Sequence, residues 1–271
     1  MKSMIASAAL AAALLAGAAW AAFPPVTDYS APGPFKVVSK EEGPDCAVFR
    51  PETLGEGGLK HPVILWGNGT RSRVPAYTPM LTQWASQGFV VAAANTNSAG
   101  SGKPILDCLD YLTAQNTADG SIFRGKLDLS KIGVSGHSQG GGGTIMAGRD
   151  PRITTTAPIE PYTVGLGYVK GAEAAQHGPM LLLSGGMDTT ATPDANQKPV
   201  FDGAKSPVIW ATLKAASHSV PATETSGEFR PVTTAWFRWT LMDDMTAGKL
   251  FQGPNCDLCR SASWTIERRG G

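Results

Sequence analysis

A serine lies within a glycine-rich motif in the middle of the chain. Residues 131–141 read Lys-Ile-Gly-Val-Ser-Gly-His-Ser-Gln-Gly-Gly, so that Ser138 stands at the centre of a G-x-S-x-G motif. A predicted strand at 132–135 precedes the motif, and a predicted small-residue helix at 140–148 follows it. This order is typical of a nucleophile elbow, a strained turn that exposes a hydroxyl for acyl transfer. The alternative is a glycine-rich turn that merely contains a serine.

A serine hydroxyl needs a base to act as a nucleophile at neutral pH. Chains with this elbow carry the triad in the order serine, acid, histidine. The four histidines are His61, His137, His177 and His218. Among them, only His218 lies beyond Ser138 with room for an acid after a later strand. We therefore predict that His218, in a small-residue loop after a predicted strand at 208–213, is the base; the alternative is a histidine of a surface loop.

The acid must lie between Ser138 and His218. The carboxylic residues in that interval are Asp150, Glu160, Glu173, Asp188, Asp194 and Asp202. Asp188 is favoured because it closely follows a predicted strand at 180–184 and would therefore stand at that strand's carboxyl end. Its expected role is to orient His218 and to stabilise the imidazolium. An exposed aspartate in a turn is the alternative.

Acyl transfer also needs two main-chain N–H groups that bind the oxyanion. Gln139, directly after the nucleophile, is predicted to supply one. The loop after an early predicted strand at 62–66 is predicted to supply the other, from Asn68 or, failing that, from Gly69. Gly67 and Gly69 would let the backbone approach the substrate closely. Asn68-Gly69-Thr70 is also a formal glycosylation sequon, but an oxyanion loop is a poor place for a glycan.

The remaining elements alternate along the chain. Further strands are predicted at 46–50, 89–94 and 154–158, and further helices at 77–87, 104–115 and 232–241. This alternation predicts a mostly parallel central sheet with helices on both faces and active residues at the carboxyl ends of the strands. Together with the nucleophile elbow it indicates an α/β-hydrolase fold. Only about twenty residues separate the strands at 154–158 and 180–184, which leaves no room for a large lid domain. We expect an open site.

Residues 1–21 have the pattern of a secretory signal peptide. Lys2 is followed by an apolar run rich in alanine, and Ala19-Trp20-Ala21 satisfies the cleavage rule. A membrane anchor is the alternative, but the run lacks flanking charge. We expect residues 22–271 to form a single domain that is secreted or periplasmic and does not span a membrane.

Export would place the four cysteines in an oxidising compartment. We expect disulfides between Cys46 and Cys108 and between Cys256 and Cys259, although sequence alone cannot fix the pairing. Cys256-x-x-Cys259 could instead be a redox motif or half of a zinc site. No second C-x-x-C accompanies it, and the histidines lack ligand spacing, so we expect no metal and no cofactor.

Lys plus Arg number 23 and Asp plus Glu 22, and this balance provides no broad basic face. We therefore expect no nucleic-acid partner, and we expect a monomer that acts on an ester substrate, small or polymeric.

The chain resembles the cutinase-like polyester hydrolases, including bacterial PET hydrolases, of the α/β-hydrolase superfamily. The resemblance rests on motifs throughout the mature chain: 32–35 (PGPF), 84–91 (WASQGFVV), 95–98 (NTNS), 136–143 (GHSQGGGG), 217–219 (SHS), and Asp188 followed by Pro193. It implies that Ser138, Asp188 and His218 form the triad and that Asn68 and Gln139 supply the oxyanion hole. It also implies that Tyr162 takes the position of a substrate-clamping tryptophan.

The sequence departs from that family at three places. Asn68 replaces an aromatic residue of the oxyanion loop, Ser184 and Val220 replace a disulfide found in some PET hydrolases, and the C-terminal cysteines are spaced differently. The predicted function is a secreted serine ester hydrolase. Alternatives are an esterase for small soluble or lipid esters without polymer activity, a non-catalytic binding protein on the same fold, and a thiol oxidoreductase that uses Cys256 and Cys259.

Overall fold

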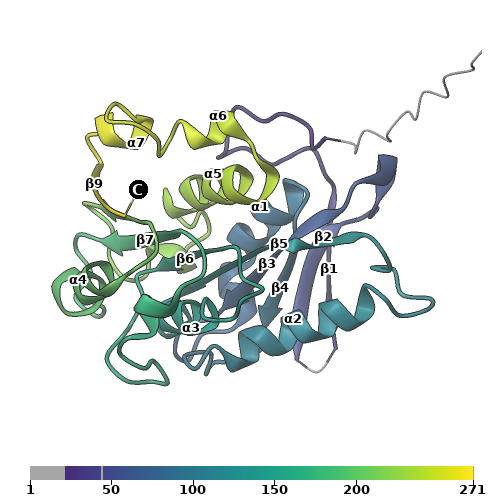
Figure 1. The fold of residues 1–271 in the computed structure, drawn as a ribbon, viewed down its shortest axis with the longest axis horizontal. Coiled ribbons are helices and arrows are strands. Elements are labelled where there is room, and N and C mark those ends of the chain that lie inside the picture. The colour runs from purple at the N-terminus through teal and green to yellow at the C-terminus, as the bar shows by residue number, and fades with distance from the viewer. Residues whose placement is uncertain (1–21, 44, 271) are drawn as a thin grey trace, which may run out of the picture.

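The computed structural model describes residues 22–43 and 45–270, which are built around a nine-stranded sheet (Figure 1). The predicted signal peptide, residues 1–21, lies outside the described residues. Within the described ranges, no helix is long and apolar enough to cross a bilayer.

The sheet is mixed and mostly parallel. Its strands are β1 (Val37–Glu42), β2 (Cys46–Pro51), β3 (His61–Gly67), β4 (Val90–Ala94), β5 (Leu127–His137), β6 (Thr155–Ile159), β7 (Met180–Gly185), β8 (Val208–Leu213) and β9 (Trp264–Arg269). Their spatial order is β1-β2-β4-β3-β5-β6-β7-β8-β9. The strands from β4 to β8 run parallel, whereas β1, β2 and β9 pair antiparallel at the two edges.

Helices connect most of the parallel strands. The α-helices are α1 (Thr78–Ser86), α2 (Lys103–Gln115), α3 (Gln139–Ala147), α4 (Pro193–Gly203), α5 (Phe229–Met242), α6 (Met245–Gly248) and α7 (Asp257–Arg260). Short 3-10 turns are η1 (Glu56–Gly58), η2 (Val74–Tyr77), η3 (Ala172–Ala175) and η4 (Val220–Ala222). Helix α1 ends as its sequence predicts, because Gly88 follows it with a φ of 107° that disfavours a side chain.

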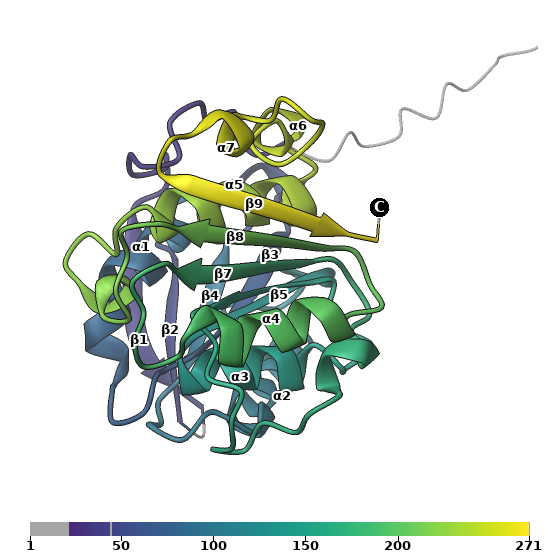
Figure 2. The same ribbon diagram turned by 90° about the vertical axis from the view of Figure 1, so that its left-hand side faces the viewer.

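Both faces of the central strands are buried, as the apolar sequences of β3 and β4 require. On one face Ile64 and Trp66 of β3 join a core with α1 and α5, and on the other Val63 and Leu65 of the same strand join a core with α2. A third cluster lies between β7, β8, α3 and α4. Figure 2 shows α2, α3 and α4 together below the sheet, with α5 above it. The predicted α/β-hydrolase fold is confirmed.

This topology brings the predicted site residues to one edge of the sheet. Loops after β3, β5, β6, β7 and β8 all leave from the carboxyl ends of parallel strands. Between neighbouring β3 and β5 the chain order reverses direction across the sheet, which is where α/β sheets bind their ligands. The segment between β6 and β7 contains only η3 as a helical element, so no lid domain covers this edge.

Both predicted disulfides are present. Cys46 of β2 pairs with Cys108 of α2, and Cys256 pairs with Cys259 at α7. The first bridge fastens β2, the strand next to the edge strand β1, to a helix of the lower layer.

Candidate active site

The nucleophile elbow lies between β5 and α3. Ser138 has a φ of 56°, a conformation that L-residues rarely adopt outside strained functional turns. Two glycines make the turn possible, because a Cβ on Gly136 would strike the carbonyl of Gly140, and one on Gly140 would strike the carbonyl of Gly67. The main chain also holds the turn, since the Ser138 N–H donates to the carbonyl of Ile159 at 3.1 Å.

The structure brings Ser138, His218 and Asp188 together in one hydrogen-bonded line. The Oγ of Ser138 lies 2.8 Å from Nε2 of His218, and Nδ1 of the same imidazole lies 2.6 Å from Oδ2 of Asp188. Asp188 follows β7 and His218 follows β8, so neighbouring parallel strands place the acid and the base. One imidazole thus contacts a hydroxyl and a carboxylate through its two nitrogens, as a serine nucleophile and its base require.

Asp188 is buried, yet its surroundings favour the carboxylate. Burial alone would raise the pKa of Asp188, but the hydrogen bond from His218 and main-chain N–H bonds from Ala191 and Thr190 hold it below its ordinary value. Both N–H bonds measure 2.8 Å and end on Oδ1, which leaves Oδ2 for the imidazole. Asp188 is therefore fixed in orientation and ionised at neutral pH.

The predicted oxyanion loop begins directly after β3 with Asn68. The Asn68 side chain is fully buried and points into the core: it accepts from the Trp66 indole at 2.9 Å and donates to the carbonyls of Ala94 and Thr96 at 2.8 and 2.9 Å. Asn68 is therefore not a wall of the acyl site, because its short side chain is held by partners on the inner side of the loop. The role of its main-chain N–H stays a prediction.

The other predicted site residues differ in burial and in their hydrogen bonds. Gln139 begins α3 and is buried directly after the serine. The Gly69 N–H already donates to the hydroxyl of Tyr77 at 3.2 Å, and Gly67 is enclosed at the end of β3. The Tyr162 N–H donates to the carbonyl of Ser138 at 2.9 Å, but Tyr162 does not line the cavity beside the serine.

That cavity has a volume of about 410 Å³ and is lined mainly by small and polar residues. They are Gly69, Thr70, Ser72, His137, Ser138, Met187, Thr189, Thr190, Ser217, His218, Ser219 and Ala222. The lining includes no Phe, Tyr or Trp, and its exposed apolar member is Met187. Thr70, which the sequence did not single out as a site residue, takes a place in the wall.

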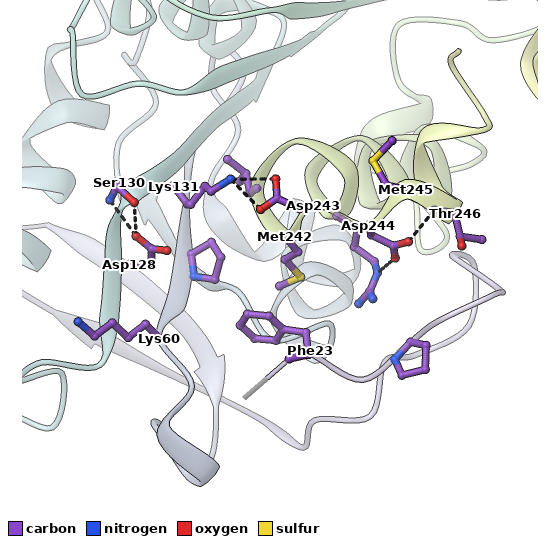
Figure 3. Close-up of a pocket in the computed structure, with 15 residues that line it drawn as sticks. Phe23, Lys60, Asp128, Ser130, Lys131, Met242, Asp243, Asp244, Met245 and Thr246 are labelled. Carbon is purple, nitrogen blue, oxygen red and sulfur yellow. Dashed lines mark hydrogen bonds and ion pairs between the residues drawn. The ribbon is translucent and has the colours of Figure 1, made fainter. Parts of the chain in front are cut away.

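A larger hollow of about 780 Å³ lies elsewhere, between the start of the described chain, the beginning of β5 and the α5–α6 junction (Figure 3). Its lining holds two ion pairs: Lys131 with Asp243 at 3.0 Å, and Arg238 with Asp244 at 2.8 Å. No serine of its lining has a histidine beside it. The hydrogen-bonded line of Ser138, His218 and Asp188 lies instead at the smaller cavity, at the carboxyl edge of the sheet.

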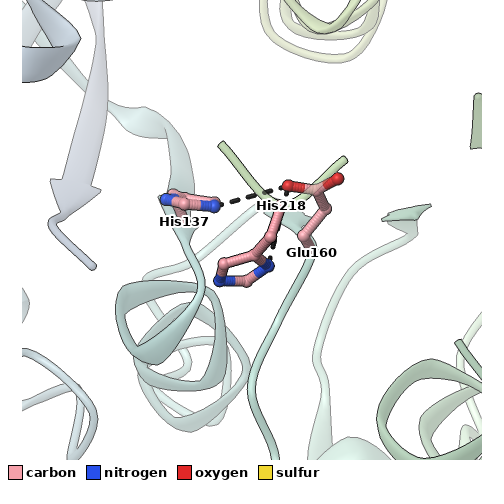
Figure 4. Close-up of side chains that lie close together, drawn as sticks. All are labelled: His137, Glu160 and His218. Carbon is pink, nitrogen blue, oxygen red and sulfur yellow. Dashed lines mark ion pairs between the residues drawn. The ribbon is translucent and has the colours of Figure 1, made fainter. Parts of the chain in front are cut away.

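Two further titratable residues lie behind the imidazole of His218. Oε2 of Glu160 lies 3.4 Å from Nε2 of His137 and 3.9 Å from Nδ1 of His218 (Figure 4). Burial, together with the charge of Asp188, raises the pKa of Glu160 to about 9. Burial and the neighbouring His218 lower the pKa of His137 to about 3. Both groups are therefore neutral at pH 7.

His137, Glu160 and His218 are also the residues that could hold a metal ion, since one ligand atom from each lies within 4.8 Å of the others. Two histidines and a glutamate are a zinc ligand set. The sequence did not indicate this cluster, because its three residues are far apart along the chain. A metal here would compete with Asp188 and Ser138 for the nitrogens of His218, so the hydrogen-bonded line and a bound metal exclude one another.

Fold and site together define an α/β hydrolase with a serine at its nucleophile elbow. A family model described as PET hydrolase-like matches residues 48–268. The chain belongs to this PET hydrolase-like family.

Several characterised proteins are similar to the chain. A bis(hydroxyethyl) terephthalate hydrolase of Streptomyces coelicolor is 28% identical over 82% of this chain and 69% of its own length. A cutinase of Thermobifida alba is 28% identical over 78% of this chain and 71% of its own, and a cutinase of Thermobifida cellulosilytica is 27% identical over 70% and 73%. The resemblance predicted from the sequence motifs is confirmed at the level of the family.

Proposed function

We propose that this chain is a secreted serine ester hydrolase in which Ser138, His218 and Asp188 form the catalytic triad. The observation that carries the proposal is the hydrogen-bonded line of these three side chains, with distances of 2.8 and 2.6 Å, beside a cavity. Membership of a family with cutinases and a terephthalate ester hydrolase supports ester hydrolysis.

In this mechanism His218 removes the proton of Ser138 as the serine attacks the ester carbonyl. Asp188 stabilises the imidazolium that forms, because its carboxylate is ionised and fixed by main-chain donors. The Gln139 N–H, at the amino end of α3, and an N–H of the loop after β3 bind the oxyanion. His218 then protonates the leaving alcohol, and water activated by the same imidazole releases the acid from the acyl-enzyme.

The cavity lining favours small or flexible acyl groups. Without a Phe, Tyr or Trp ring in the lining, a flat terephthalate unit forgoes stacking worth about 0.5–1.5 kcal/mol per ring, or roughly two- to tenfold in binding. We therefore propose short and medium acyl esters and aliphatic polyesters as substrates, with weak activity on aromatic polyesters. The second candidate is an esterase confined to small esters, which the modest volume of about 410 Å³ also favours.

Export to the periplasm or the medium is part of the proposal. It is supported by the signal-peptide pattern of residues 1–21 and by two disulfides that an oxidising compartment would preserve.

Kinetics on a series of p-nitrophenyl esters and on an aliphatic polyester film test the proposal. We expect hydrolysis of both, a preference for acyl chains of short and medium length, and complete loss in Ser138→Ala with an unchanged thermal midpoint. Hydrolysis of small esters alone would favour the second candidate. Undiminished turnover by the alanine variant would refute the triad.

A further inference from the structure

Glu160 has no part in the triad, although it lies where a triad acid could lie. It directly follows β6, which is adjacent to β7 in the sheet, so Glu160 and Asp188 leave from neighbouring strand ends. Both carboxyl groups approach the same atom: Nδ1 of His218 is 2.6 Å from Asp188 and 3.9 Å from Glu160. Figure 4 shows the Glu160 carboxyl beside the two imidazoles, with an oxygen directed toward both rings.

The fold makes room for this carboxyl group. The side chain of Glu160 is fully buried, and neither of its oxygens has a hydrogen-bond partner at normal distance. Gly185 leaves space for it, because a Cβ there would strike Oε1 of Glu160 and the main-chain carbonyl oxygen of Ala216. Glu160 itself has a φ of 44°, an unfavourable conformation for a residue other than glycine that persists where its surroundings impose it. A buried carboxyl group without a partner is costly, so this arrangement calls for a role.

The titratable groups that face Glu160 come from several elements. They are His137 at the end of β5, Asp188 after β7 and His218 after β8, with Tyr77 behind His137 at 2.9 Å from its Nδ1. Asp188 carries the negative charge nearest to Glu160 and is one of the two causes that keep Glu160 protonated, the larger cause being burial. Loss of the Asp188 charge would therefore favour ionisation of Glu160.

We propose that Glu160 is a second acid for His218: a positioning residue that supports the imidazole beside Asp188 and takes over its orientation when the Asp188 carboxylate is absent. The inference rests on the proposed serine mechanism. In the unsubstituted protein Asp188 holds Nδ1 of His218 at 2.6 Å. When Asp188 is replaced, a movement of the imidazole by about one ångström brings Nδ1–H within hydrogen-bond distance of Oε2 of Glu160.

The test compares Asp188→Asn with the double variant Asp188→Asn/Glu160→Gln across pH 6 to 10, with kcat and KM for p-nitrophenyl butyrate as the readouts. A triad that loses its one acid loses about 10⁴-fold in kcat. We expect Asp188→Asn to lose less than this, with the loss in kcat and little change in KM. The double variant should be slower than Asp188→Asn by about tenfold or more in kcat, again with little change in KM.

Glu173→Gln in the Asp188→Asn background is the matched control. Glu173 is also a buried glutamate, but it bonds to the Tyr168 hydroxyl away from the triad. We expect this control to keep the kcat and the KM of Asp188→Asn. Asp188→Ala, with and without Glu160→Gln, repeats the comparison without a side-chain amide at position 188, and circular dichroism establishes that each variant is folded.

The outcomes separate this inference from the proposed function. Equal activity of Asp188→Asn and the double variant at every pH, in an otherwise active enzyme, would overturn the role of Glu160 and leave the triad intact. An unsubstituted enzyme that neither hydrolyses esters nor reacts with a fluorophosphonate would overturn the proposed function and the inference with it.

Discussion

The two disulfides should contribute very unequally to stability, because they close loops of different length. Cys46 and Cys108 are 62 positions apart in the chain, whereas Cys256 and Cys259 are 3 apart. If a disulfide acts mainly by restricting the unfolded chain, these separations correspond to about 4.3 and about 1.6 kcal/mol at 25 °C. The perturbation is a pair of double variants, Cys46→Ala/Cys108→Ala and Cys256→Ala/Cys259→Ala.

Urea denaturation under oxidising conditions measures both losses. We expect the first double variant to lose more free energy of unfolding than the second by about 2 to 3 kcal/mol, and its thermal midpoint to fall by roughly 8 to 16 °C. Ester hydrolysis at 25 °C should change little in either, since none of the four cysteines lines the cavity beside Ser138. Equal losses in the two variants, or a larger loss from the C-terminal pair, would refute the reasoning.

Three further predictions concern the surroundings of the triad. The raised pKa of Glu160 contributes stability that is complete below the ordinary carboxyl pKa and is lost as pH rises toward about 9. In urea titrations between pH 5 and pH 9, the free energy of unfolding of Glu160→Gln should therefore fall less than that of the unsubstituted enzyme. Parallel curves for the two proteins would contradict this. EDTA should leave ester hydrolysis unchanged. Excess zinc should inhibit hydrolysis by binding to His137, Glu160 and His218. If EDTA abolished the activity and a divalent metal restored it, the enzyme would need a metal. Asn68→Ala should lower the free energy of unfolding by about 1 to 3 kcal/mol, because it leaves the Trp66 indole and the carbonyls of Ala94 and Thr96 without their hydrogen-bond partner. An unchanged urea midpoint would mean that the Asn68 side chain lies outside the core.

The central strands and the elbow could be predicted because their physical requirements are local. An apolar run such as 89–94 can be buried on both faces only within a covered sheet, and the glycines around Ser138 are needed for a turn that no larger residue permits. The order serine, acid, histidine along the chain then selected Asp188 and His218, which the structure places at the ends of the adjacent strands β7 and β8.

The edges of the sheet could not be predicted in this way. Strands β1 and β9 were missed because their outward residues are polar or charged, as in Ser39-Lys40-Glu41, and such segments look like loops. Helix α4 was missed because it begins with Pro193 and contains Pro199, a residue that usually ends a helix.

The direction in which side chains point could not be predicted from the sequence either. Sequence order identified Asn68 as a loop residue but could not tell that its amide turns inward to Trp66. Glu160 was among the candidate acids, and the position of Glu160 at the end of an apolar strand was the available signal. Which strand ends converge on one imidazole is decided by the spatial order of the sheet, which spacing along the chain does not give.

The most direct test of the triad is covalent labelling of the serine. The purified enzyme is treated with a fluorophosphonate, its intact mass is measured, and the modified peptide is sequenced by mass spectrometry. The account predicts a single adduct on Ser138, formed in step with the loss of ester hydrolysis and absent from Ser138→Ala and, at matched times, strongly slowed in His218→Ala. An adduct on another residue, or persistent ester hydrolysis after complete labelling of Ser138, would contradict it.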